Sequence, residues 1–204
     1  EVFLATKVWI DSLAPEDVKR TTQESLDRLG VEYLDLLYVH WPANTYDPAT
    51  TLPAFEELKE AGLIRHIGVS NFEPSDLETA NEVLDQAPFA NQIEMHPLLP
   101  QEELREAVAD TRTEIVAYSP LARGEVFDVP EISAVAGKHD VSEAQVSLAW
   151  LDAKGVSRIP KATSRAHIED NWASLDLELD AEDVAKIDSI DRTERQVDPD
   201  FSPW

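Results

Sequence analysis

Residues Leu34–Val39 read LDLLYV, and His40, Trp41 and Pro42 follow them directly. The run is apolar and too short for a typical helix, so it predicts a strand buried on both faces, as in a parallel sheet. Five similar runs occur along the 204-residue chain. They are Val2–Val8, Ile64–Val69, Phe89–Met95, Glu114–Tyr118 and Gly155–Ile159.

Helical patterns fill the intervals between these runs. Pro15 suits a first helical turn, and Gly30 signals the end of that helix. Its predicted buried stripe is Val18, Thr22, Leu26 and Leu29. Further helices are predicted over 52–61, 74–84, 101–109, 130–139, 142–154, 164–175 and 180–190. Ser142 and Gln145 have the spacing of a capping box.

Alternating strands and helices predict an α/β fold, either a doubly wound sheet or a (β/α)₈ barrel. No Gly-x-Gly-x-x-Gly follows any predicted strand, and the chain holds only 6 glycines, which weakens the doubly wound option. There is no low-complexity linker and no break in composition. We therefore expect a single domain over residues 1–204.

The composition excludes several classes of protein. With 17 Lys and Arg against 41 Asp and Glu, the net charge is −24, so we expect no nucleic-acid partner. The absence of cysteine excludes disulfides, cysteine-ligated zinc and thiol catalysis. No apolar run is long enough to cross a membrane, and we expect a cytoplasmic protein. Acidic residues spread along the chain favour a protein from a high-salt cytoplasm over an ordinary acidic enzyme.

Each predicted strand delivers polar or aromatic side chains at its carboxyl end. In a barrel these ends share one face, where active sites are built. Core packing does not explain such a pattern. The residues are Lys7, Trp9, His40, Trp41, Ser70, Asn71, Gln92, Tyr118, Ser119, Pro160 and Lys161. Glu94 and His96 lack metal-ligand spacing to any other histidine, so we interpret them as structural and expect no metal.

The motifs around these residues resemble the aldo-keto reductase family in order and spacing. They are Thr6-Lys7-Val8-Trp9, Val39-His40-Trp41-Pro42, Gly68-Val69-Ser70-Asn71-Phe72, Asn91-Gln92-Ile93-Glu94, His96-Pro97, Ala117-Tyr118-Ser119-Pro120-Leu121 and Pro160-Lys161. The resemblance covers essentially the whole chain and implies a (β/α)₈ TIM barrel, here with about six of eight βα units. It implies reduction of an aldehyde or ketone, keto sugars among them, by hydride transfer from NADPH.

The resemblance also assigns roles to residues. Lys7 and His40 match catalytic positions, and Trp9 and Trp41 match the walls of a substrate pocket. The positions that match cofactor contacts are Ser70, Asn71, Gln92, Tyr118, Ser119, Leu121, Arg123, Lys161, His167 and Asn171. A cation such as Lys7 beside a phenol lowers its pKa, which suits a tyrosine for proton transfer.

The family's catalytic aspartate and tyrosine precede the strand of Lys7, and the two βα units that carry them are absent here. Tyr46 is the one conceivable substitute for the tyrosine. Three interpretations stay open: a piece of a full-length reductase, which we favour, a fragment that associates with a second copy, or an inactive nicotinamide-nucleotide-binding or accessory module. We expect the full-length protein to be a monomer acting on a small carbonyl compound.

The segment after the last strand bears on the choice of cofactor. Lys161 and Asn171 match the family's NADP-binding run, whereas Ala162 replaces a serine and His167 replaces an arginine. A guanidinium binds phosphate through a planar fork of donors, whereas a histidine is mostly neutral at pH 7. We therefore expect NADPH to be preferred by a narrow margin, with usable NADH activity.

Overall fold

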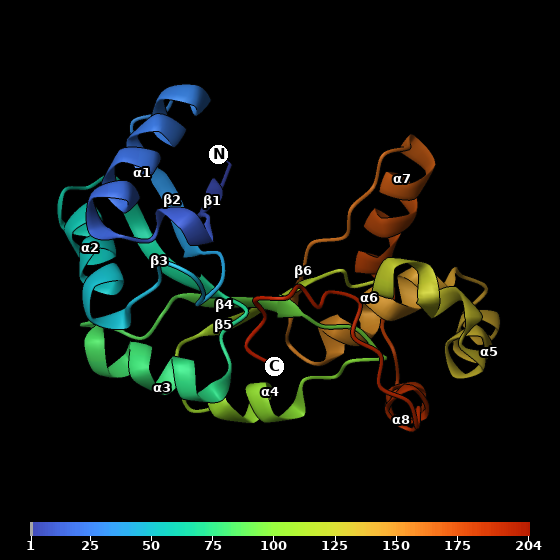
Figure 1. Ribbon diagram of the computed structural model, residues 1–204. Helices are drawn as coiled ribbons and strands as arrows, with labels where there is room; N and C mark the ends of the chain where they lie inside the picture. The colour runs from blue at the N-terminus through green and yellow to red at the C-terminus, as the bar shows by residue number, and fades with distance from the viewer. Residues whose placement is uncertain (1) are drawn as a thin grey trace. The chain divides into compact units, whose positions relative to one another are not determined.

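The computed structural model describes residues 2–204 as a parallel sheet with a helix in every crossover (Figure 1). The sheet order follows the chain order from β1 to β6. The strands are β1 (Ala5–Val8), β2 (Leu34–Val39), β3 (Ile64–Ser70), β4 (Ala90–Glu94), β5 (Glu114–Tyr118) and β6 (Ser157–Arg158). Consecutive parallel strands with helical crossovers confirm the predicted α/β fold.

The helices lie where the sequence pattern placed them, within a few residues. The α-helices are α1 (Pro15–Leu29), α2 (Pro48–Glu60), α3 (Pro74–Val83), α4 (Glu102–Val108), α5 (Pro130–His139), α6 (Glu143–Ala153), α7 (Arg165–Ala173) and α8 (Ala181–Asp188). Short 3₁₀ segments are η1 (Ile10–Ser12), η2 (Ala122–Asp128) and η3 (Ser174–Asp176). Gly30 ends α1 with a φ of 67°, a left-handed conformation that glycine adopts without a steric cost.

Two predicted boundaries were wrong. The helix predicted from residue 52 begins at Pro48, because the side chain of Asp47 caps it by accepting a hydrogen bond from the backbone N of Ala49 at 3.1 Å. The last strand was predicted over 155–159 and pairs only at Ser157 and Arg158. Pro160 has no N–H to continue a ladder, so the chain leaves the sheet there.

Two side-chain predictions were also wrong. Leu29 was placed on the buried stripe of its helix but is 52% exposed, whereas Val18, Thr22 and Leu26 are buried. Only one of the two hydrogen bonds of the expected capping box forms. The hydroxyl of Ser142 accepts from the backbone N of Gln145 at 3.1 Å. The Gln145 side chain instead donates to Asp170 at 2.6 Å and so ties α6 to α7.

The chain divides into two compact units. The first holds residues 2–92, 103–114 and 199–204. Its core lies where β1, β2 and β3 pair and where α1 packs on α2 and α2 on α3. β2 is buried along its whole length, as its unbroken apolar run predicted. Phe55 and Phe72 are completely buried in this unit.

The second unit holds residues 93–102 and 115–198. α6 is its centre: it contacts α5, α7, α8 and β6 and carries the buried Leu148 and Trp150. The indole nitrogen of Trp150 donates to Asp188 at 2.8 Å, so its one polar atom is satisfied. Lys154 bonds the same carboxylate at 2.6 Å and fixes α8 against α6.

Candidate active site

Lys7 is the centre of a polar cluster in the first unit, formed by side chains near the carboxyl ends of β1 and β3 and from the middle of β4. Its amine donates to Oε1 of Gln92 at 2.5 Å and to the hydroxyl of Ser70 at 3.4 Å. Ser70 and Gln92 lie 63 and 85 residues away from Lys7 in sequence. Parallel pairing brings their strand ends together, as the sequence predicted for Lys7, Ser70 and Gln92.

Asn71 holds the backbone around this cluster. It has a left-handed φ of 62°, which asparagine tolerates better than most residues. Its side-chain nitrogen donates to the backbone oxygen of His40 and to the hydroxyl of Ser70, both at 3.1 Å. Ser70 in turn donates to the backbone oxygen of Gln92 at 2.8 Å. Asn71 and Ser70 therefore cross-link the ends of β2, β3 and β4.

Burial is the main influence on the protonation of Lys7 and His40. Burial lowers the pKa of Lys7 to about 8. Burial also lowers the pKa of His40 to about 4, and the charge on Lys7 contributes. At pH 7 Lys7 therefore remains mostly protonated, and His40 is neutral. A neutral imidazole beside an ammonium group can donate a hydrogen bond to a substrate oxygen without carrying charge itself.

Aromatic side chains surround His40. The ring of Trp9 lies edge-on to His40 with centroids 4.8 Å apart, and Trp9 is 45% exposed. Trp41 is buried. Phe201 lies edge-on to Trp9 at 5.9 Å and to Trp41 at 5.5 Å, and Trp204 lies 5.3 Å from Trp41. Phe201 and Trp204 were not predicted, because nothing in a proline-containing tail indicates what it packs against.

The tyrosines of the first unit differ in their surroundings. Tyr38 was not singled out from the sequence, although it lies in β2 two residues before His40, the residue that directly follows the strand. Tyr46, the conceivable substitute for a catalytic tyrosine, packs edge-on to Phe72 at 5.5 Å. Burial, Asp76 and Asp47 raise its pKa well above the usual range, which does not favour an acid catalyst. Tyr33 stacks on the guanidinium of Arg65 at 4.0 Å.

Tyr118 and the loop after it belong to the second unit. Burial, with Glu94 adding, raises the pKa of Tyr118 well above its usual range, so its ring is neutral. Ser119 and Arg123 have left-handed φ values of 48° and 53°. The buried hydroxyl of Ser147 donates to the backbone oxygen of Pro120 at 2.7 Å and fixes this turn. The loop presents Arg123 on the surface and a half-buried Leu121.

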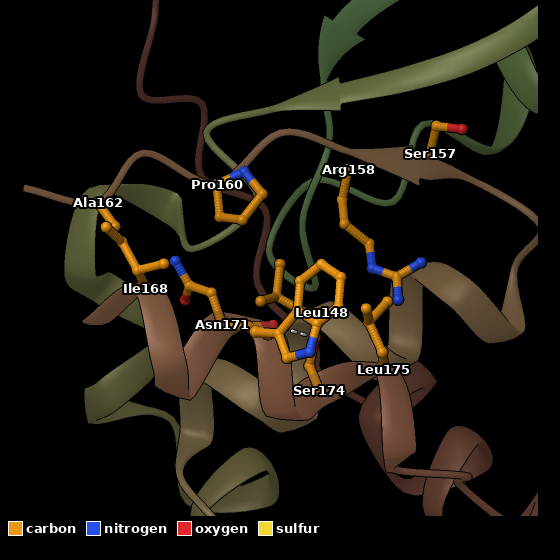
Figure 2. A pocket seen from close by; sticks show the side chains of 10 residues that line it. Leu148, Ser157, Arg158, Pro160, Ala162, Ile168, Asn171, Ser174 and Leu175 are labelled. Carbon is orange, nitrogen blue, oxygen red and sulfur yellow. Dashed lines mark hydrogen bonds between the residues drawn. The ribbon is translucent and has the colours of Figure 1, made fainter. Parts of the chain in front are cut away.

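Lys161, His167 and Asn171 lie around the loop from β6 to α7. Lys161 and His167 are exposed. The hydroxyl of Ser164 accepts from the backbone N of His167 at 3.2 Å and caps α7. Asn171 lines a pocket of about 420 Å³ (Figure 2). Figure 2 shows its amide among Pro160, Ala162 and Ile168. The role of Asn171 in cofactor binding stays a prediction.

Glu94 and His96 form a buried pair in the second unit. His96 Nε2 lies 2.9 Å from Glu94 Oε1, and the two side chains are 1% and 0% exposed. The Glu94 carboxylate also accepts from the backbone N of Gln196 at 2.7 Å and of Val197 at 2.9 Å. Within residues 2–204, no three His, Cys, Asp or Glu side chains are arranged to hold a metal ion.

The chain matches the model of the aldo/keto reductase family over residues 1–192. The chain belongs to the aldo/keto reductase family. An aldo-keto reductase of Mycobacterium sp. (strain JLS) is 40% identical over 96% of this chain and 71% of the relative. A glyoxal reductase of Bacillus subtilis (strain 168) is 38% identical over 96% of this chain and 70% of its own length. Enzymes of this family are oxidoreductases that reduce carbonyl compounds.

Solved structures of other aldo/keto reductases agree with the fold. An aldose reductase from Schistosoma japonicum superposes with a TM-score of 0.91 at 28% identity and covers 96% of this chain and 71% of that one. The aldo-keto reductase of Bombyx mori in complex with NADP has a TM-score of 0.88 at 32% identity, over 97% of this chain and 70% of that one.

Of the helices described for this chain, none is long and apolar enough to traverse a bilayer.

Proposed function

We propose that this chain carries the cofactor-binding and substrate-orienting part of the active site of a nicotinamide-dependent reductase of small aldehydes and ketones. The observation that carries the proposal is the convergence of Lys7 from β1 and Gln92 from β4 beside His40, which follows β2. The motifs around these residues are those of the family to which the chain belongs. Two relatives are named glyoxal reductase and methylglyoxal reductase, so 2-oxoaldehydes are the first substrates to try.

Each of the two units carries side chains that suit a part of a nicotinamide cofactor. Ser70, Asn71 and Gln92 supply the amide and hydroxyl groups that a carboxamide needs, and the ring of Tyr118 is neutral and suited to stacking. Arg123 and Lys161 are exposed cations in a chain of net charge −24, and cations of this kind bind phosphate oxygens. Ser119, Leu121, His167 and Asn171 complete the proposed contacts. The cofactor would supply the hydride.

His40 and Lys7 have different roles in this proposal. The neutral His40 orients the substrate by donating to its carbonyl oxygen, and the edge-on Trp9 limits the rotation of the imidazole. The Lys7 ammonium provides positive charge where negative charge develops on that oxygen. Trp9 and Trp41, with Phe201 packed on both, form an apolar wall for the carbon skeleton. Lys7 and His40 are therefore the proposed catalytic residues.

The test combines binding with turnover on the full chain. Quenching of tryptophan fluorescence by NADPH measures binding, and NADPH oxidation with methylglyoxal measures turnover. We expect binding in the wild type, weaker binding in Gln92→Leu, and no effect on binding in the surface control Gln23→Leu. Turnover that Lys7→Met abolishes would support a reductase. Binding without turnover fits a reductase whose catalytic tyrosine is not among these residues, and it equally fits the alternative, a cofactor-binding module that performs no reduction. No binding of NADPH or NADH at any salt concentration would contradict both.

Cofactor preference follows from residue 167. We propose that NADPH is preferred over NADH by a narrow margin, because His167 stands where the family resemblance expects an arginine, whose planar fork of donors binds phosphate. Arg165 lies two positions earlier on α7, about 200° around the helix from His167, and its Nε bonds Glu169 at 2.7 Å. We expect His167→Arg to widen the NADPH-to-NADH affinity ratio. A wild-type ratio that is already large and unaffected by His167→Arg would contradict this role.

A further inference from the structure

Helix α7 joins the rest of the second unit without burying a side chain. None of its 9 residues is buried. Its large apolar side chains, Ile168 and Trp172, are 56% and 71% exposed. Two of the proposed cofactor contacts, His167 and Asn171, lie on this helix. The interactions that fix α7 therefore bear on where those contacts lie.

One side of α7 faces the pocket of about 420 Å³ (Figure 2). Leu148 lines this pocket from α6, while Ile168 and Trp172 line it from α7. Side chains of the two helices do not meet where the pocket lies, so dispersion attraction between them is small on this side. Asp170 is two positions from both Ile168 and Trp172, which places it about 200° around the helix, on the opposite side.

On that opposite side, Asp170 bonds the start of α6 through both carboxylate oxygens. Oδ2 accepts from the hydroxyl of Ser142 at 2.8 Å, and Oδ1 accepts from Nε2 of Gln145 at 2.6 Å. Hydrogen bonds to an ionised carboxylate are stronger than those between neutral groups, and the start of a helix favours an anion. In the described part of the chain, no other side chain of α7 bonds residues 142–154, so Asp170 is the polar link between α7 and α6.

We propose that Asp170 is a positioning residue for the cofactor: its carboxylate fixes α7 on the start of α6 and so sets where His167 and Asn171 lie. Both of its oxygens bond α6 or its cap, so Asp170 acts through the placement of α7 rather than by touching the cofactor. A chain in which α7 is docked for only part of the time binds the cofactor more weakly, in proportion to that fraction. This consequence rests on the proposed function, in which α7 faces the 2′-phosphate of NADPH.

The sign of the effect separates positioning from simple electrostatics. Asp170 is an anion three positions from His167, near the proposed site of a phosphate. If only its charge mattered, removing it would tighten NADPH binding, because like charges repel. If it positions α7, removing it weakens binding. Glu169→Ala is the matched control, since Glu169 is an exposed carboxylate next to Asp170 that bonds Arg165 of the same helix at 2.7 Å.

The experiment measures two quantities in the full chain: hydrogen exchange of the α7 backbone amides, by mass spectrometry, and the affinities for NADPH and NADH, by calorimetry. We expect Asp170→Ala to speed exchange in α7 about tenfold or more, because two charge-assisted bonds are lost. NADPH affinity should weaken about two- to tenfold, and NADH affinity should weaken less because NADH has no 2′-phosphate. Glu169→Ala should leave exchange nearly unchanged and NADPH affinity unchanged or tighter.

Two further variants test the hydrogen bonds themselves. Asp170→Asn keeps an acceptor for Gln145 and offers an NH₂ group to the Ser142 hydroxyl, so it should restore most of the NADPH affinity lost in Asp170→Ala. Gln145→Ala removes one bond from a residue that is not a proposed cofactor contact, and it should also weaken NADPH binding. Combined with Asp170→Ala it should add less than its separate effect, because the two residues share a bond.

Two outcomes would overturn the proposal. One is unchanged exchange in α7 of a folded Asp170→Ala chain, and the other is NADPH binding by that chain as tight as in wild type or tighter. If Asp170→Ala does not fold, Gln145→Ala decides by the same two measurements. A wild-type chain that binds neither NADPH nor NADH would contradict the proposed function, while the exchange rates would still decide whether Asp170 fixes α7.

Discussion

The carboxylate of Glu94 accepts a hydrogen bond from the backbone N of Val197 at 2.9 Å, across 103 residues of sequence. Its other oxygen accepts from the backbone N of Gln196 and lies next to Nε2 of the buried His96. Three donors converge on one carboxylate that is 1% exposed, which satisfies a group that is costly to bury alone. Glu94 thereby anchors the segment that precedes the C-terminal aromatic residues.

Replacing Glu94 with Gln should release this segment. A glutamine would present an NH₂ group to one of the two backbone donors, and a hydrogen bond to a charged group is typically about 1.5–3 kcal/mol. Because about 1.4 kcal/mol is a factor of ten, we expect trypsin to cleave after Arg192 and Arg195 about tenfold faster or more. Glu102→Gln, at an exposed position on α4, is the control. Equal cleavage rates in wild type and Glu94→Gln would contradict the anchoring role.

Replacing Lys7 with Met should stabilise the fold while it removes the proposed catalytic charge. Burial lowers the pKa of Lys7 from 10.5 to about 8, so the folded chain bears the cost of a buried ammonium group below pH 8. That cost shrinks as pH rises from 8 to 10.5, because the folded state loses the proton first. Urea unfolding should show Lys7→Met more stable by roughly 1–2 kcal/mol at pH 7 and by little at pH 10.

The control for this substitution is Lys186→Met on the exposed surface of α8, which should show no such pH dependence. A Lys7→Met chain that is less stable than wild type at pH 7 would mean that the bonds to Gln92 and Ser70 outweigh burial of the charge.

Asp183 should be the main anchor of α8. Its carboxylate is 3% exposed and bonds Lys138 at 2.8 Å and His139 at 2.7 Å. Burial acts against its charge, but these two bonds outweigh it and lower the pKa of Asp183. Asp183→Ala should destabilise the chain by about 1–3 kcal/mol in urea unfolding.

The exposed neighbour Glu182 supplies the control, and Glu182→Ala should change stability by about 0.5 kcal/mol or less. The pH dependence has a defined sign. A carboxyl with a lowered folded pKa contributes stability above its unfolded pKa of about 4 and loses it as pH falls through the folded pKa. A destabilisation by Asp183→Ala that stays constant from pH 7 to pH 2 would contradict the ionic part of this account.

Salt should stabilise the chain. The net charge is −24, and its self-repulsion acts over a Debye length that grows from about 3 Å at 1 M salt to about 30 Å at 0.01 M. We therefore expect the melting temperature, followed by circular dichroism, to fall steadily as KCl is removed. A melting temperature that does not vary across the series would show that the charge is no adaptation to salt.

The amino-acid sequence determined the α/β class and the approximate limits of the elements, because apolar runs and helical periodicity are local. Leu34–Val39 is buried along its length, as an unbroken apolar run requires. The sequence also predicted that the side chains of Lys7, Ser70 and Gln92 meet, because parallel strands bring their carboxyl ends to one edge of the sheet. Family motifs supplied the proposed roles, which local pattern alone does not give.

Only the tertiary structure decided which polar atoms pair. The bond from Lys7 to Gln92 and the packing of the Tyr38 ring against Gly68 depend on strand register, which is set by long-range packing. The packing of Phe201 on Trp41 and the anchoring of Val197 by Glu94 join distant segments, for which no periodicity exists to detect. The lowered pKa values of Lys7 and His40 also depend on the tertiary structure, since burial in the folded chain is the main cause of both shifts.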